Sequence, residues 1–203
     1  MTERDTPADT PERLAELLVH IARSARCEPG AAGEGGGDDG AGTPLTPAQW
    51  SALRFFARAN QGSRTPSAFA SFQATTRGTA SQTIKTLEAR GLLSRRRAED
   101  DGRSVRFDLT AAGRVRLAGD PLRHLGAVLA GLDERARDAL ARILPEIADR
   151  LAAERGGGAI GTCATCDHYA AEGQGGYCAC LAAGLPPGEI GQLCARYAPR
   201  VAG

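Results

Sequence analysis

Apolar residues recur at helical spacing in the middle of the chain. After Thr76, one face of a helix is formed by Ala80, Thr83, Ile84 and Leu87. Thr76 is suited to cap the start of this helix, and Gly91 stands where it is expected to end. The opposite face carries Arg, Ser, Gln and Lys side chains with no apolar bulk, so it is predicted to face outward.

Beyond Gly91 the hydrophobic period changes from that of a helix to that of a strand. Residues 94–98 follow two leucines, residues 99–102 have the composition of a turn, and residues 104–109 alternate. In the alternating segment Val105, Phe107 and Leu109 point one way, and Ser104, Arg106 and Asp108 the other. A helix followed directly by a basic hairpin predicts a winged helix-turn-helix.

Other helices are predicted where Thr-Pro pairs precede apolar stripes, at Thr10, Thr46 and Thr65. The expected apolar positions are Leu14, Leu17, Leu18 and Ile21 in the first helix, Trp50, Leu53, Phe56 and Ala57 in the second, and Phe69 and Phe72 in the third. The third helix, ending at Phe72, is expected to pack on the helix after Thr76.

Long apolar stripes dominate the region after the hairpin. Thr110 opens a helix that residues 119–121 interrupt, and residues 122–132 and 133–151 then form two further stripes. These stripes exceed what the small winged helix can cover, which suggests an interface between two chains. The alternative is a helical hairpin within one chain. The predicted fold class is mainly α with a small β wing.

The amino-acid composition indicates how the chain is divided into domains, where its charge is concentrated and where in the cell it is expected. The 203 residues carry a net charge of only +1, but residues 90–106 hold six arginines against three carboxylates. This local excess is what contact with a polyanion requires. With no run of 18 apolar residues and no apolar signal at the N-terminus, the expected location is the cytoplasm, without membrane contact. Residues 1–9 are expected to be disordered, 28–43 to form a flexible Gly-rich loop within a main domain at 10–155, and 156–203 to form a separate tail.

The central stretch resembles the MarR family of winged helix-turn-helix regulators. The matching pieces are the helix end at 87–92, the Asp-Gly-Arg wing at 101–103 and the closing segment at 109–113, and the likeness spans roughly Leu45 to Ala153. The resemblance implies a homodimer that binds a pseudo-palindromic double-stranded DNA operator. It also implies that Arg103 enters the minor groove.

The predicted DNA contacts combine the helix, the hairpin and the segment before residue 70. Arg, Lys and Gln read base edges in the major groove, and hydroxyls at helix N-termini contact phosphates. The candidates are Arg64, Thr65, Ser67, Thr76, Arg77, Thr79, Ser81, Gln82, Lys85, Arg95, Arg97, Arg103 and Arg106.

Five of the six cysteines lie in the tail, at positions 163, 166, 178, 180 and 194. Cys163 and Cys166 have the C-x2-C spacing that lets two thiolates bind one metal centre. A segment this small is expected to need a bound metal to stabilise its fold. The first interpretation is a 4Fe–4S cluster, because the order C-x2-C, single Cys, then Cys-x2-aromatic is similar to that of high-potential iron–sulfur proteins.

Two alternatives remain open for the same cysteines. They bind structural zinc, with His168 able to replace one thiolate, or they form disulfides or peroxide-sensing thiols. The preferred ligand set is Cys163, Cys166, Cys178 and Cys194. Cys178 is chosen because the tail is similar to that of MarR-like chains with the form C-x2-C…YC…L…C, and Cys180 is the alternative.

Three functional hypotheses follow. The first is a dimeric transcriptional regulator whose four-cysteine centre senses redox or iron state. The second is the same regulator with a zinc-stapled tail and control by a small-molecule effector. The third is a redox or electron-carrier protein in which the winged helix only contacts proteins. No catalytic triad, paired carboxylates or nucleotide loop stands out, so no enzyme is expected.

Overall fold

The computed structural model describes residues 10–25, 44–97, 105–156 and 158–200. Contacts divide the chain into two compact units, one comprising Met1–Pro44 and Gly119–Asp133 and the other Leu45–Ala118 and Glu134–Gly203. The Gly-rich loop expected at 28–43, the tip of the wing, Cys27 and the first nine residues all lie outside the described residues. None of the helices in the described ranges has the length and apolar character needed to span a bilayer.

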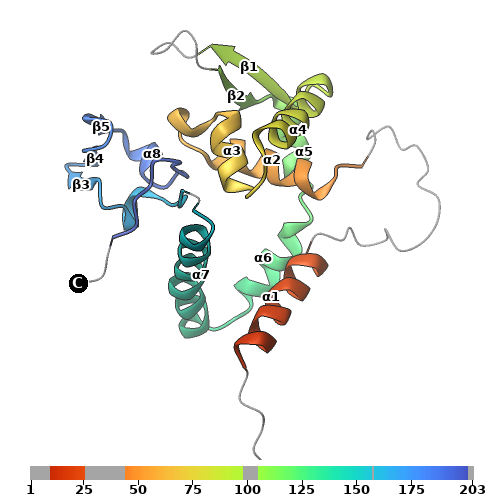
Figure 1. The fold of residues 1–203 in the computed structure, drawn as a ribbon, viewed down its shortest axis with the longest axis vertical. Coiled ribbons are helices and arrows are strands. Elements are labelled where there is room, and N and C mark those ends of the chain that lie inside the picture. Colours follow the sequence, from red (N-terminus) through yellow and green to blue (C-terminus); the bar gives the residue numbers. More distant parts are fainter. Residues whose placement is uncertain (1–9, 26–43, 98–104, 157, 201–203) are drawn as a thin grey trace, which may run out of the picture. The chain divides into compact units, whose positions relative to one another are not determined.

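The first unit contains helices α1 (Pro11–Ser24) and α6 (Leu122–Ala130) (Figure 1). Thr10 caps α1 by accepting the backbone N–H of Arg13, as the Thr-Pro pair predicted. The large apolar side chains of α1 are exposed, with Leu14 at 49%, whereas in α6 Val128 is 66% exposed and Leu122, Leu125 and Leu129 are half-buried. Exposed apolar stripes of this kind are normally covered by another surface.

The second unit begins with a winged-helix lobe, residues 45–118. Its elements are α2 (Pro47–Arg58), the short 3-10 helix η1 (Gln61–Ser63), α3 (Pro66–Phe72), α4 (Arg77–Ala89), β1 (Leu93–Arg97), β2 (Val105–Leu109) and α5 (Ala111–Ala118) (Figure 1). β1 and β2 pair antiparallel, with Leu93 opposite Leu109. The predicted order of helices, hairpin and closing helix is confirmed.

Local chemistry fixes the ends of these helices. Thr46 and Gln49 form a reciprocal capping box at α2, and Thr65 and Thr76 cap α3 and α4. Gly91 ends α4 with a φ of +68°, a left-handed conformation that glycine adopts without the strain of a Cβ.

The core of the lobe lies between α2, α3, α4 and the wing. Phe55, Phe56 and Phe69 are almost fully buried, and their ring centroids lie 5.2–5.8 Å apart. One expectation for this core was wrong. Ala57 is exposed and Phe55 is buried in its place, so the buried face of α2 is rotated relative to the predicted stripe. Phe72 is 39% exposed and packs on the Phe55 ring of α2.

Helix α7 (Glu134–Glu154) follows the lobe in the same unit. Its large apolar residues Ile143, Leu144, Ile147 and Leu151 are exposed, with Ile143 at 51% and Leu151 at 44%, while Leu140 is half-buried. It also contains Pro145, which cannot donate a backbone hydrogen bond and which the sequence analysis had not considered.

The tail is a small sheet with short helical turns. Its elements are the 3-10 helix η2 (Cys163–Thr165), β3 (Tyr169–Glu172), β4 (Gly175–Cys178), β5 (Ala183–Leu185) and α8 (Pro187–Ile190). The strands form an antiparallel sheet in the order β3-β4-β5, with Tyr169 opposite Cys178. No hydrophobic period in the sequence predicts this sheet, since its strands are short and rich in alanine and glycine.

Candidate nucleic-acid interface and four-cysteine site

Helix α4 presents two chemically distinct faces. Ala80, Ile84 and Leu87 are buried in the lobe. The predicted contact residues on the other face are exposed at Arg77, Thr79, Gln82 and Lys85 and half-buried at Ser81. This outer face therefore consists of hydrogen-bond donors and acceptors without apolar side chains, as a surface that reads base edges requires.

Some of the predicted hydroxyl contacts already serve the fold. The Thr76 hydroxyl accepts the Thr79 N–H at 3.2 Å, and the Thr65 hydroxyl accepts the Ala68 N–H at 3.2 Å. Both therefore cap helix N-termini, and Ser67 beside Thr65 remains exposed. Capping positions these hydroxyls at the positive ends of two helices, where anions are favoured.

The wing carries arginines along β1. Arg95 and Arg97 are exposed, whereas Arg106 on β2 is half-buried and stands opposite Arg96 in the register. Arg103, the residue that the family resemblance places in the minor groove, lies outside the described residues.

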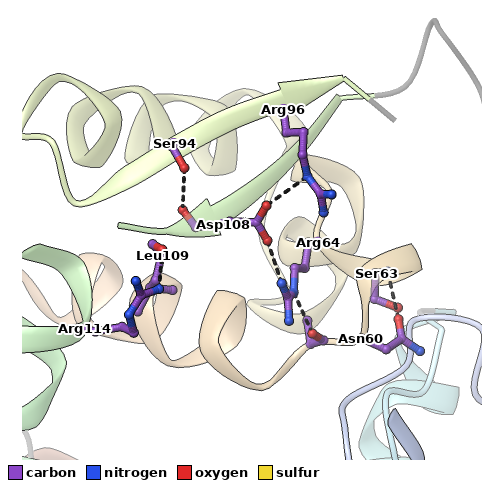
Figure 2. A network of polar contacts seen from close by, with 9 residues as sticks. Asn60, Ser63, Arg64, Ser94, Arg96, Asp108, Leu109 and Arg114 are labelled. Atoms are coloured by element: carbon purple, nitrogen blue, oxygen red, sulfur yellow. Dashed lines mark hydrogen bonds and ion pairs between the residues drawn. The ribbon is translucent and has the colours of Figure 1, made fainter. Parts of the chain in front are cut away.

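A carboxylate that the sequence analysis did not single out holds the base of the wing. Asp108 on β2 binds the Arg64 guanidinium at 2.6 Å and the Arg96 guanidinium at 3.1 Å (Figure 2). Arg64 also donates to the Ala59 carbonyl at 2.9 Å, and its own carbonyl accepts the Phe107 N–H at 2.9 Å. Arg64, predicted as a phosphate contact, thus uses its guanidinium to join the wing to the segment before α3. The signal in the sequence is the single acidic residue on the polar face of β2.

The tail brings four of its cysteines together. Cys163, Cys166 and Cys178 are buried and Cys194 is half-buried, while Cys180 is exposed. Burial raises the pKa of the Cys163 thiol above its ordinary value, and the nearby thiols of Cys194, Cys166 and Cys178 raise it further. These four are the preferred ligands of the sequence analysis, and the alternative, Cys180, is not among the groups that act on Cys163.

Each cysteine is positioned by a different local element. The turn of η2 brings the Cys166 N–H to the Cys163 carbonyl at 3.1 Å, and the sheet register sets Cys178 opposite Tyr169. Cys194 donates its N–H to the Gly161 carbonyl at 2.8 Å, two residues before Cys163. Cys163, Cys178 and Leu185 then share one small buried cluster against which Tyr169 and Ile190 pack.

Proximity does not by itself make these thiols a site for one ion. Within the described residues, no three His, Cys, Asp or Glu side chains are placed close enough together to hold a single metal ion. Cys163 and Cys178 lie in one buried cluster, and the backbone N–H groups of Cys166 and Cys194 bond to the carbonyls of Cys163 and Gly161. The four sulfurs therefore share one region of the tail, and their ligand role is not demonstrated by this arrangement.

Comparison with known proteins supports the interpretation of the lobe. Residues 43–104 match a family model described as the MarR family. No curated protein matches the chain in sequence. Among solved structures, the chain is similar to S. aureus MepR in a DNA complex, with 17% identity over 72% of this chain and 99% of that chain and a TM-score of 0.52. It is also similar to the transcriptional repressor CouR bound to a 23-mer DNA duplex, with 25% identity over 73% of this chain and 99% of that chain and a TM-score of 0.50.

These matches settle the class of the fold. The likeness to MepR confirms a mainly helical winged helix-turn-helix with a small β wing. The family match covers residues 43–104, within the stretch that resembles the MarR family in sequence. The match ends at residue 104, before the tail begins, so it does not address the four cysteines.

Proposed function

We propose that this chain, a winged-helix transcriptional regulator whose residues 43–104 match the MarR family, binds operator DNA as a homodimer and senses a redox or iron signal through four cysteines. The observation that carries the DNA-binding part is the outer face of α4, which is exposed and wholly polar next to the exposed arginines of β1. A helix of this kind fits the major groove, with the wing beside it over the phosphates.

The exposed cationic side chains of α4 and β1 support contact with a DNA duplex. Lys85 and Arg77 are exposed cations on α4, and Arg95 and Arg97 are exposed cations on β1. Cations near phosphates release counterions on binding, so the affinity should fall steeply with salt. The DNA duplexes in the MepR and CouR structures belong to those proteins, and their transfer to this chain is part of the proposal.

A homodimer follows from the apolar stripes of three helices. The exposed large apolar residues include Leu14 and Ile21 of α1, Val128 of α6, and Ile143 and Leu151 of α7. Apolar faces of this extent are normally covered by a partner, and a second copy of the chain is the simplest one. A symmetric dimer presents two α4 helices, so the expected operator is a pseudo-palindrome.

The four-cysteine site is proposed as a metal centre, a 4Fe–4S cluster in preference to zinc. Thiolates are the ligands that iron–sulfur clusters and zinc share, and Cys163, Cys166, Cys178 and Cys194 supply four of them. Burial and the neighbouring thiols raise the pKa of Cys163, so a metal that binds its thiolate would release a proton. The centre would supply the redox or metal sensitivity, and the residues of the tail would hold it.

DNA binding is tested by selecting duplexes from a random pool with the full chain, then measuring the affinity for the selected duplex over a range of salt. Lys85→Ala and Gln82→Ala should each weaken sequence-specific binding by about 1–3 kcal/mol. The matched control is Gln174→Ala, an exposed glutamine in the tail. Failure of the wild-type chain to select any sequence would remove the regulator proposal.

The metal proposal is tested on protein that is purified without oxygen. Iron and acid-labile sulfide in similar amounts, with visible absorbance that Cys163→Ser abolishes, would support the cluster. Zinc alone would favour a structural zinc site. The absence of both iron and zinc would rule out the proposed metal centre.

A further inference from the structure

The last cysteine of the tail lies in a segment that is built into the winged-helix lobe. We name residues Leu193, Cys194 and Ala195 the docking segment. The Leu193 N–H donates to the Arg58 carbonyl at 2.8 Å, and the Asn60 N–H donates to the Leu193 carbonyl at 2.9 Å. The docking segment therefore runs as a short parallel bridge along the end of α2, with Leu193 paired to Ala59.

Side chains strengthen this attachment. Leu193 and Ala195 pack against the hydrophobic core of the lobe. The Ala195 N–H donates at 2.8 Å to the hydroxyl of Ser63, which is only 3% exposed. A buried hydroxyl that loses its partner costs free energy, so the lobe is more stable with the segment in place.

The receiving residues also hold the wing. We name residues 58–64 the connector, since they link α2 to α3. Figure 2 shows that the connector carries Asn60, Ser63 and Arg64, and that Arg64 reaches Asp108 of the wing. The Arg64 carbonyl in turn accepts the Phe107 N–H of β2. One seven-residue stretch thus contacts the tail through Asn60 and Ser63 and the wing through Arg64.

A cavity lies beside the docking segment, between the tail and α3. It has a volume of about 440 Å³ and is lined by Ser63 of the connector and Cys194 of the docking segment, and also by Ser67 and Ser71 of α3 and by Leu181 and Arg196 of the tail. Attachment at the connector, with open space beside α3, allows the tail to loosen without disrupting the packing of α3 on the core.

We propose that the state of the four-cysteine site reaches the DNA-binding surface through the docking segment and the connector. This inference rests on the proposed role of the cysteines and names the route by which they act. Cys194 belongs to the four-cysteine site and is flanked by the two residues that dock, so its position sets theirs. When the four cysteines are held together the connector is braced, and when they are released it loses the hydrogen bonds of Leu193 and Ala195. Arg64 then no longer orients the wing for DNA.

Hydrogen exchange of the full chain tests the route without DNA. In Cys163→Ser, the amides of Asn60 and Phe107 should exchange about tenfold faster or more, as expected when one or two net hydrogen bonds are lost. The matched control is Cys180→Ser, the same replacement at an exposed cysteine outside the group, which should leave both amides unchanged. Unchanged exchange at Asn60 and Phe107 in Cys163→Ser would overturn the inference.

A second variant separates this inference from the proposed function. Operator affinity is measured for the chain with its thiols intact and after alkylation with iodoacetamide, and the ratio of the two affinities is the coupling. Ser63→Ala should move this ratio at least about threefold toward unity, because it removes one docking hydrogen bond of modest net strength. Ser51→Ala, which removes a hydrogen bond to Gln73 within the lobe, should leave the ratio as in the wild type.

The outcomes separate as follows. A wild-type ratio well above unity that persists in Ser63→Ala overturns the route and leaves cysteine sensing intact. A wild-type ratio of unity removes the sensing proposal and, with it, the inference.

Discussion

The winged-helix lobe and the tail belong to one unit but are held together by different means. The lobe has a core of interlocked rings, with Phe55, Phe56 and Phe69 each at most 1% exposed. In the tail, the buried cluster among the described residues consists of Cys163, Cys178 and Leu185. Fully burying a large apolar side chain contributes about 1.5–3 kcal/mol, so the lobe gains several times more from burial than the tail does.

The difference explains why cysteines gather in one region and phenylalanines in the other. A domain of about 60 residues is already marginally stable because it buries little surface, and the tail is shorter still. The docking segment joins the tail to the lobe, and the proposed centre of four thiols would supply further stability. Experiments that remove a core contact should therefore damage the lobe, and experiments on the thiols should damage the tail.

The largest effect is expected when the thiols can no longer act together. Cys163→Ser, or treatment of the wild type with a strong chelator, should melt β3, β4 and β5 while the lobe stays folded, because burial alone cannot hold so small a sheet. Amide resonances of 169–185 should collapse in an NMR spectrum, while those of 50–90 persist. Cys180→Ser is the control. A tail that keeps its resonances after both treatments would show that its fold does not depend on the cysteines.

A glycine in the lobe provides the converse test. A Cβ added at Gly113 of α5 would lie 2.1 Å from the backbone oxygen of Leu92, which cannot move without shifting the start of the wing. Gly113→Ala should therefore destabilise the lobe by about 1–3 kcal/mol or more, despite the better helix propensity of alanine. Urea denaturation followed by tryptophan fluorescence of Trp50 measures it.

The control for this substitution is Gly78→Ala in α4, where the nearest atom to an added Cβ is 3.9 Å away. It should be neutral or stabilising by up to about 1 kcal/mol. Equal losses in the two variants would mean that the contact with Leu92 is not what requires glycine at position 113.

The contrast between lobe and tail also separates what the sequence predicts from what it does not. Period and caps predict α2, α3, α4 and the hairpin, since one buried face and a Thr-Pro start leave few alternatives. The period alone does not fix which face of α2 is buried: Ala57 was predicted to be buried, and Phe55 is buried instead. Several rotations of α2 about its axis would bury an aromatic residue. The strands of the tail show no alternation of apolar and polar residues. Their sheet forms through backbone pairing of segments that are rich in glycine and alanine.

The candidate site divides in the same way. The exposed polar face of α4 follows from the stripe on its other side, so Gln82 and Lys85 could be found from the sequence. The hydrogen bond between Arg64 and Asp108 could not be found from the sequence, because these residues are 44 positions apart and meet only in the folded lobe. Leu193 and the connector are separated by even more residues along the chain, and the C-x2-C spacing does not predict that they are in contact.

A smaller effect is expected from the carboxylate at the base of the wing. Asp108→Asn removes the charge that binds Arg64 and Arg96, and it should cost the lobe about 1–3 kcal/mol, near the lower end because Arg96 is partly exposed. Operator affinity should fall as well, because the wing loses one of its two links to the connector and keeps only the hydrogen bond from the Phe107 N–H to the Arg64 carbonyl. Glu172→Gln, an exposed carboxylate of the tail, is the matched control for denaturation and for DNA titration. If Asp108→Asn matches this control in both measurements, the ion pairs do not hold the wing.

The smallest expected effect is a pH dependence that belongs to the tail and not to the lobe. Burial and the neighbouring thiols raise the pKa of Cys163 above its ordinary value of 9.0, so the folded tail favours the neutral thiol more than the unfolded chain does. Its contribution to stability is fully present below the ordinary pKa and is lost as the pH rises through the higher folded value. Any part of the tail that stays folded without metal should therefore lose further stability above about pH 9, while the lobe is unaffected over the same range.

Bound metal should reverse the sign of this dependence. A metal binds the thiolate and displaces its proton, so a metal-loaded tail should become more stable as the pH rises toward about 9. Proteolysis between residues 158 and 200, followed by mass spectrometry at several pH values with and without chelator, measures both slopes. Identical slopes in the two conditions would mean that Cys163 keeps its proton when metal is present and is not a ligand. Opposite slopes would tie the thiol, the metal and the fold of the tail to one equilibrium.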